Sequence, residues 1–257
     1  MLDEGTGLLT TVGLLAALRF LTVLPLPGNS STPGELASAA GYFPVVGLLI
    51  GLILAACDAL LRPALPDQVL AALLIIIMLG ITGGLHADGL ADTCDGLFVA
   101  GASPERRLEV MRDSRVGGYG VAGVVSVLLL QYAGLASLPP AVRTSALVAM
   151  PALSRWAMTY ALIGFPYARS QGLGVAFQPA SRVRALSVAT VFTLLTCGLL
   201  LGTSGAFLLA TVWASTWMAA RLVMTRLPGL TGDTYGAINE VTQGLVLVLL
   251  TATKGSL

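Results

Sequence analysis

The chain of 257 residues is 56% hydrophobic and only 11% charged, well below the roughly 25% charged residues of an ordinary soluble domain. Its mean hydropathy of +0.86 comes from long apolar runs, which indicates that lipid surrounds most of the fold and excludes a water-soluble globular domain. A formal net charge of +1 gives no electrostatic basis for binding nucleic acid.

The first apolar run is LLTTVGLLAALRFLTVLPLP, near the N-terminus. It is short for a spanning helix and is interrupted by Arg19. Asp3 and Glu4 precede it in place of the basic residues of a cleaved signal peptide. We therefore predict a short re-entrant or interfacial helix that Pro25 and Pro27 end.

After this run the chain contains about seven candidates for spanning helices, each with close to 20 mostly apolar residues. Since neither a fixed-period repeat nor a soluble appendage interrupts them, we predict an all-α polytopic membrane helix bundle that forms one domain over residues 1–257. The candidate spans lie near residues 40–61, 66–85, 117–138, 141–165, 185–203, 205–225 and 237–252.

Arginines concentrate in three connections, over residues 86–116, 166–184 and 221–236, while the intervening turns carry one arginine or none. An excess of arginine marks the cytoplasmic side of a membrane protein. Alternating the spans places all three connections on that side, together with the segment PLPGNSSTPGEL. Within the first connection we expect Arg106 and Arg107 to face lipid headgroups.

The most unusual motif is GGLHADGLADTCDGL, which follows an apolar run and begins at Gly83. Asp88, Asp92 and Asp95 are spaced i, i+4 and i+7, so they share a narrow arc of a helix. Three carboxylates on one face repel one another unless a cation lies among them, and Mg²⁺ is commonly held by a few carboxylates and substrate phosphates. A solvated helix end is the competing interpretation, but acids beside the bilayer are costly without a partner.

His86 precedes this cluster and points roughly opposite to Asp88 on a continuous helix. A lone histidine is often a hydrogen-bonded structural residue. A role as general base is the other interpretation that the sequence leaves open.

A second motif, RRLEVMRDSRVGGYGVAG, combines Asp113 with Arg112 and Arg115. Gly117 and Gly120 then lead into a spanning helix. Glycines at the start of a helix and nearby arginines suit the oxygens of a phosphate group. The competing interpretation is a flexible loop whose arginines meet lipid headgroups.

A third motif, LPGLTGDTYGAINE, contains Asp233 and Glu240. A helix N-cap explains Asp233 well, whereas Glu240 falls at or below the membrane surface. Arg155 lies inside an apolar run and needs a buried partner or a water-filled cavity, and Arg169 precedes the GLG of the next loop. These motifs together predict a cytoplasm-facing, cation-binding pocket suited to transfer between phosphate esters.

The segments LRFLTVLPLP, GYFPVVGLLIG, GGLHADGLADTCDGL, MRDSRVGGYGV and LTGDTYGAINE resemble, in order and spacing, the motifs of the cobalamin synthase (adenosylcobinamide-GDP ribazoletransferase) family. The resemblance implies a Mg²⁺-dependent integral enzyme of the bacterial or archaeal cytoplasmic membrane, with its site facing the cytoplasm. It implies joining of adenosylcobinamide-GDP to α-ribazole or its 5′-phosphate. The products are adenosylcobalamin or its 5′-phosphate, and GMP.

The resemblance also assigns residues. The first three aspartates fall on the family's acidic motif, Asp113 on its DS motif and Asp233 on its TGD motif. With the residues chosen above, we predict metal binding by Asp88, Asp92, Asp95, Asp113, Asp233 and Glu240, catalysis by Asp95, Asp92 and His86, and substrate binding by Arg112, Arg115, Gly117, Gly120, Arg155 and Arg169.

Three alternatives remain at this stage: a CDP-alcohol phosphatidyltransferase, an aspartate-rich prenyltransferase and an acid-lined transporter. The first lacks its DGxxAR arrangement, because Thr93 stands where the arginine is needed, and the second lacks paired aspartate-rich motifs. Transporters often carry an inverted repeat, which is absent from this sequence.

A corrinoid is too large for a pocket buried between helices, so we expect the site to be an open cleft. The sequence leaves a homo-oligomer open.

Overall fold

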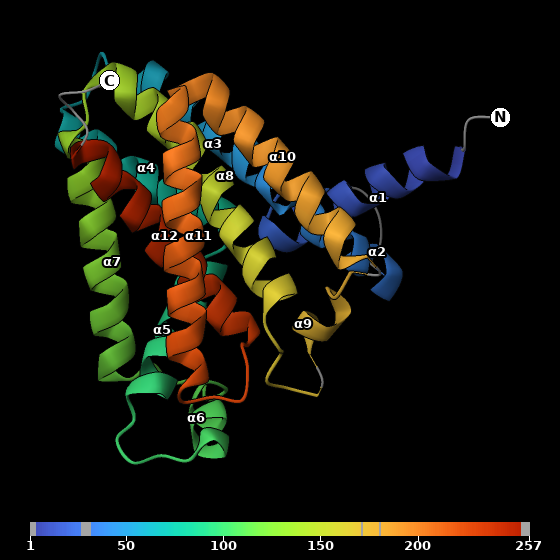
Figure 1. The fold of residues 1–257 in the computed structure, drawn as a ribbon. Coiled ribbons are helices and arrows are strands. Elements are labelled where there is room, and N and C mark those ends of the chain that lie inside the picture. Colours follow the sequence, from blue (N-terminus) through green and yellow to red (C-terminus); the bar gives the residue numbers. More distant parts are fainter. Residues whose placement is uncertain (1–3, 27–31, 171, 180, 253–257) are drawn as a thin grey trace.

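The computed structural model describes residues 4–26, 32–170, 172–179 and 181–252. These residues are helical apart from loops and one isolated bridge, which confirms the all-α class (Figure 1). The elements are α1 (Glu4–Leu21), α2 (Pro33–Ala39), the 3-10 helix η1 (Ala40–Tyr42), α3 (Phe43–Leu61), α4 (Asp67–Thr82), α5 (Leu85–Phe98), α6 (Pro104–Val110), α7 (Gly118–Ser137), α8 (Pro140–Gly164), α9 (Leu173–Ala176), α10 (Arg182–Leu201), α11 (Thr203–Met224) and α12 (Gly232–Ala252).

The described residues contain six helical segments long and apolar enough to span a membrane, and a seventh if the bent pair α4 and α5 counts as one span. The prediction of about seven spans and a short N-terminal helix is therefore confirmed. The predicted span over residues 66–85 differs in detail. Its helix α4 ends at Thr82, and the chain turns by 90° before α5 begins.

The N-terminal helix α1 ends at Leu21, four residues before Pro25. The prediction that Pro25 ends it is wrong, and Pro27 lies outside the described residues. The helix ends earlier because the residue after Thr22 pairs with another element. The Val23 N–H donates to the Ile81 carbonyl in the last turn of α4, at 2.8 Å.

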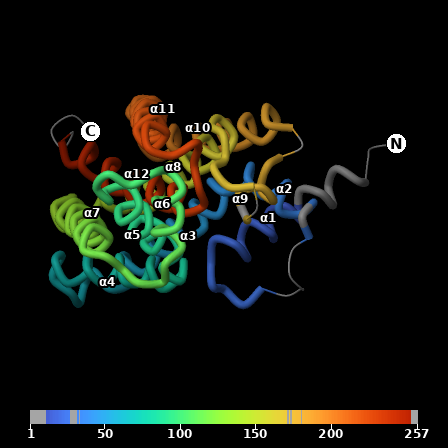
Figure 2. Tube along the Cα trace, turned by 90° about the horizontal axis from the view of Figure 1, so that it is seen from below, coloured from blue at the N-terminus to red at the C-terminus, as the bar shows by residue number. Residues whose placement is uncertain are grey.

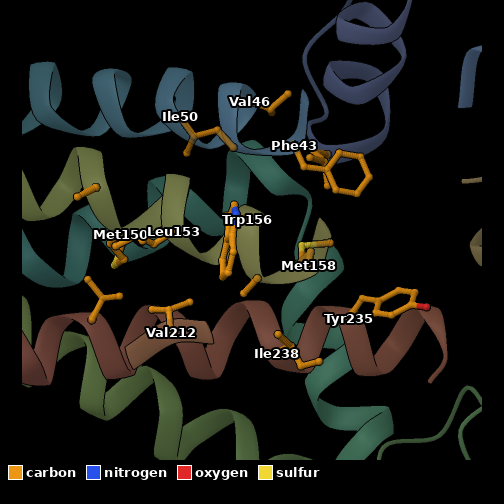
Figure 3. Close-up of a cluster of buried hydrophobic side chains, with 14 of the residues drawn as sticks. Phe43, Val46, Ile50, Met150, Leu153, Trp156, Met158, Val212, Tyr235 and Ile238 are labelled. Atoms are coloured by element: carbon orange, nitrogen blue, oxygen red, sulfur yellow. The ribbon is translucent and has the colours of Figure 1, made fainter. Parts of the chain in front are cut away.

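The almost completely buried helix α8 forms the centre of the bundle, with α3, α10, α11 and α12 packed around it (Figure 2). Its closest neighbour is α3, where Gly47 and Gly51 face the backbone of α8. A Cβ atom on Gly51 would approach the Leu147 carbonyl oxygen to 2.7 Å, so only glycine permits this separation. Small residues drive such close packing of membrane helices through dispersion contacts. Figure 3 shows apolar side chains of α3, α8, α11 and α12 filling the space between these helices.

The connections sort to the two ends of the bundle. The connections that hold α6 and α9, and the one between α11 and α12, lie at the lower end in Figure 1, whereas the short turns into α8 and α11 lie at the upper end. The three connections in which arginines concentrate therefore share one end, as the charge bias predicted. That this end faces the cytoplasm stays a prediction.

The upper end contains a partly buried cluster of ion pairs. Asp58 and Arg143 are both fully buried, and Arg143 Nε lies 3.0 Å from Asp58 Oδ1. Arg143 Nη1 lies 2.6 Å from Asp67 Oδ1, and Arg62 pairs with Asp58. The cluster ties α3, α4 and α8 together.

Candidate active site

The acidic motif starts at a sharp hinge. Gly83 and Gly84 have φ angles of +61° and +71°, which are left-handed values that glycine adopts at little cost. The hinge turns the chain by 90° from α4 into α5. It also lies against the N-terminal segment, because a Cβ atom on Gly83 would come within 2.6 Å of a methyl group of Val23. The glycine pair thus directs α5 away from α4 toward α12.

The contact between α5 and α12 is close because glycines form it. A Cβ atom on Gly89 would lie 2.8 Å from the carbonyl oxygen of Asp233, and one on Gly236 would lie 3.2 Å from the backbone of His86. The backbones can therefore approach, and the acidic motif of α5 lies beside the first turn of α12. Two motifs about 140 residues apart in the chain thus form one site.

The three aspartates of α5 lie at increasing depth. Asp88 is exposed, Asp92 is half-buried and Asp95 is buried. The charges of Asp88, Asp95 and Asp233 all act on Asp92, and Arg169 opposes them. The prediction that the spacing of Asp88, Asp92 and Asp95 places them on one helix is confirmed. Asp233 approaches them from α12.

Arg169 reaches this cluster through a short pairing of two loops. The Ala168 N–H donates to the Leu230 carbonyl at 2.7 Å, and the Leu230 N–H donates to the Pro166 carbonyl at 2.8 Å. This pairing leaves Arg169 Nη2 at 2.8 Å from Asp233 Oδ2. The guanidinium is therefore the counter-charge that the fold supplies to the acids.

Asp95 is already engaged by the backbone. Its Oδ2 accepts a hydrogen bond from the Gly117 N–H at 2.6 Å, and its Oδ1 accepts one from the Gly120 N–H at 2.8 Å. A Cβ atom on either glycine would clash with this carboxylate. The predicted phosphate donors and the predicted ligand thus bind each other, and Asp95 satisfies the free N–H groups that begin α7. Their roles toward metal or phosphate stay predictions.

The second motif places its charges at the surface. Arg115 donates through Nε to Asp113 Oδ1 at 3.0 Å and through Nη2 to Oδ2 at 2.7 Å. These hydrogen bonds lower the pKa of Asp113 to about 2. Arg112 is exposed beside them. The motif therefore forms an exposed loop in which the predicted ligand and the predicted phosphate donor are paired.

The structure corrects the expectation for Arg107. Arg106 is exposed and pairs with Glu109, but Arg107 is buried, so it does not face lipid headgroups. Its Nη1 donates to the carbonyl of Leu97, which also accepts a hydrogen bond from Arg226 Nη1. Both arginines satisfy carbonyls at the end of α5. Sequence reasoning missed this role, although arginine near a helix C-terminus is the signal for it.

The interior of the bundle contains a buried polar network (Glu240, Gln131, Asn239, Gln243, Arg155 and Ser154). Glu240 accepts hydrogen bonds from the side-chain amides of Gln131 at 2.9 Å, and of Asn239 and Gln243 at 3.2 Å each. Fully buried Arg155 donates to Ser154 Oγ at 3.0 Å, and its charge acts on Glu240.

Three predicted site residues, Arg155, Glu240 and His86, therefore lie in the interior. The charge of Arg155 acts on Glu240 and His86, while its Nε and Nη2 are buried without a hydrogen-bond partner among the described residues. Glu240 is held by amides instead of joining the aspartates. Sequence reasoning missed Gln131 and Gln243, whose signal is a polar side chain within an apolar helix.

The chemistry of these acidic side chains suits a hard divalent cation. Asp88, Asp92 and Asp233 offer carboxylate oxygens, the ligand type that Mg²⁺ prefers, and their mutual repulsion favours a positive partner. Among the residues that the structure describes, no group of three or more His, Cys, Asp or Glu side chains is placed to hold a metal ion, so Mg²⁺ binding stays a prediction.

Comparisons with known proteins match most of the chain and indicate one family. The family model described as cobalamin-5-phosphate synthase matches residues 13–251. Relatives named adenosylcobinamide-GDP ribazoletransferase include that of Desulforamulus reducens, 38% identical over 92% of this chain and 95% of its own length. The relative from Geotalea daltonii is 40% identical over 93% of this chain and 96% of its own length. The one from Roseiflexus sp. is 42% identical over 91% of this chain and 87% of its own length. No solved structure matches the chain.

Proposed function

Since the chain belongs to the cobalamin-5-phosphate synthase family, which confirms the resemblance seen in its motifs, we propose that it joins adenosylcobinamide-GDP to ribazole and releases GMP. The observation that carries this proposal is the convergence of Asp88, Asp92 and Asp233 with Arg169. The family match favours this reaction over the phosphatidyltransferase, prenyltransferase and transporter alternatives.

The reaction is a displacement at phosphorus. A ribazole hydroxyl attacks the phosphorus that carries the cobinamide, a new P–O bond forms, and the P–O bond to the GMP leaving group breaks. The hydroxyl proton passes to a carboxylate, for which we choose Asp92, because it is half-buried and surrounded by three other acids.

Arg169 is placed to meet the diphosphate. Its guanidinium is held by Asp233 and has further donors available to phosphate oxygens. Mg²⁺, which Asp88, Asp92 and Asp233 would hold together with substrate phosphate oxygens, would supply neutralisation of the phosphate charge. Asp88 is exposed, so a large substrate can approach from the surface.

Two finer points belong to the same proposal. The description of the matching family names a 5-phosphate product, and we take ribazole 5′-phosphate as the substrate that gives it. The arginines of the lower connections support an orientation in the cytoplasmic membrane with the site facing the cytoplasm.

The test is GMP release by the full chain purified in detergent. We expect GMP only when adenosylcobinamide-GDP, ribazole 5′-phosphate and Mg²⁺ are all present, and none with EDTA. Asp92→Asn removes the activity, whereas Glu109→Gln, which removes an exposed carboxylate from α6, retains it. Failure of the folded wild-type chain to release GMP contradicts the proposal.

A further inference from the structure

A cavity of about 130 Å³ adjoins the acids. Asp88 and Asp233 line one part of it, and three phenylalanines line another. Phe20 comes from α1, Phe43 from α3 and Phe177 from the segment after α9. Elements far apart in the sequence thus converge on one small space beside the proposed reaction centre.

The three phenylalanines form a compact aromatic wall. The ring centroids of Phe20 and Phe177 are 4.4 Å apart, those of Phe43 and Phe177 are 5.6 Å apart, and those of Phe20 and Phe43 are 6.1 Å apart. Phe43 and Phe177 are almost fully buried. Figure 3 shows Phe43, Met158 and Tyr235 together at one end of the core, and all three line the cavity. The cavity is therefore suited to a flat apolar ring.

Two polar atoms around the cavity are unsatisfied. His86 and Tyr235 line it, and His86 Nε2 and Tyr235 Oη are buried without a hydrogen-bond partner among the described residues. A buried polar atom without a partner costs free energy, and native proteins rarely leave one unexplained. A ligand that brings one hydrogen-bonding atom into the cavity would satisfy one of these two groups.

We propose that this cavity binds the benzimidazole ring of ribazole. The inference rests on the proposed function and identifies where its nucleophilic substrate sits. A benzimidazole is flat and apolar, and its free ring nitrogen accepts one hydrogen bond, which the Tyr235 hydroxyl can donate. Guanine, the other flat base in the reaction, has polar groups along two edges, which suit an aromatic wall less well than an apolar benzimidazole does.

The placement explains why the cavity and the acids adjoin. With its base against Phe43 and Phe177, the ribose extends toward Asp88 and Asp233, which line the same space. The attacking hydroxyl then lies near the carboxylates. The placement also gives the N-terminal helix a function, because Phe20 of α1 contributes to the aromatic wall.

The test measures the KM for each of the two substrates in variants of the cavity. Tyr235→Phe and Phe177→Leu are each expected to raise the KM for ribazole about 3- to 10-fold, the loss expected for one neutral hydrogen bond or one aromatic contact. The KM for adenosylcobinamide-GDP is expected to stay unchanged. Tyr160→Phe and Phe98→Leu are the matched controls, because Tyr160 packs on Trp156 and exposed Phe98 packs on Tyr119.

A second probe isolates the hydrogen bond. Direct binding of ribazole, and of an indole riboside that lacks the free ring nitrogen, is measured without corrinoid. Tyr235→Phe should weaken ribazole binding about 3- to 10-fold and leave binding of the indole riboside unchanged. A rise in the KM for adenosylcobinamide-GDP instead would assign the cavity to guanine and overturn the proposal, as would folded variants that bind ribazole normally.

The two proposals can fail separately. If the wild-type chain releases GMP but these variants retain normal ribazole binding, the cavity assignment is wrong and the function stands. If the wild-type chain releases no GMP but binds ribazole, and Tyr235→Phe weakens this binding, the cavity assignment stands and the reaction is wrong. Absence of ribazole binding to the wild-type chain overturns the cavity assignment.

Discussion

The charge clusters near the two ends of helix α8 differ in their balance of acids and arginines. Near its start, Asp58 and Asp67 face Arg62 and Arg143, so the acids and arginines balance. Beyond its end, Asp88, Asp92 and Asp233 face Arg169. The described residues thus complete one cluster and leave the other with excess negative charge. We infer that the balanced cluster is structural and that the unbalanced one is completed by a ligand.

The largest expected effect comes from removing an acid of the unbalanced cluster. Asp92→Asn should lower kcat for GMP release by about 10³-fold, within the range for loss of a catalytic acid or base. The thermal midpoint should stay equal or rise, because the change relieves repulsion from the neighbouring carboxylates. Retained activity, or a clearly lower midpoint, would contradict the distinction between the two ends.

The same substitution in the balanced cluster should act on stability instead. Asp58→Asn removes the fully buried counter-charge of Arg143 and leaves that arginine paired only with half-exposed Asp67, which costs about 3 kcal/mol of unfolding free energy. Thermal unfolding in detergent measures the loss, while activity per folded molecule should remain. Adding Arg143→Met should recover part of the loss. Unchanged stability of Asp58→Asn would show that the pair is not structural.

Arg169 should be more sensitive to shape than to charge. Arg169→Gln should lower kcat/KM by about 10- to 100-fold, the loss of one or two charge-assisted hydrogen bonds. Arg169→Lys should recover little, because a lysine lacks the planar fork that can meet Asp233 and a phosphate together. GMP release at varied adenosylcobinamide-GDP measures this effect. Full recovery with lysine would mean that only the positive charge matters.

Much of this architecture was predictable because it is local. Apolar runs predict spanning helices, and the i, i+4, i+7 spacing placed Asp88, Asp92 and Asp95 on one helix. The 90° hinge was not predicted, since a glycine pair can bend a chain or sit within a loop, and the choice depends on packing against Val23.

Contacts between distant elements account for the remaining differences. The sequence predicted that Gly117 and Gly120 donate hydrogen bonds to phosphate. In the structure their N–H groups donate to Asp95 instead. Arg155 and Glu240 were predicted as site residues because a charge in an apolar run is costly. Tertiary packing instead gives Glu240 a hydrogen bond from Gln131 of α7, and the charge of Arg155 acts on it inside the bundle. The aromatic cavity has no local signature, because its three phenylalanines come from separate segments.

The smallest expected effect concerns the exposed pair Asp113 and Arg115, which lies outside both clusters. The pKa of Asp113 is lowered from 3.8 to about 2 by its hydrogen bonds with Arg115. A lowered pKa means that the folded state favours the ionised acid, so the stabilisation is full above about pH 4 and disappears as the pH falls toward 2. Solvent screens the pair, so the effect is small. Asp113→Asn should therefore have a slightly lower thermal midpoint than the wild type at pH 6, and the two midpoints should converge at pH 2. A difference that grows as the pH falls would reverse the sign and show that this loop is stabilised by something other than the ionised carboxylate.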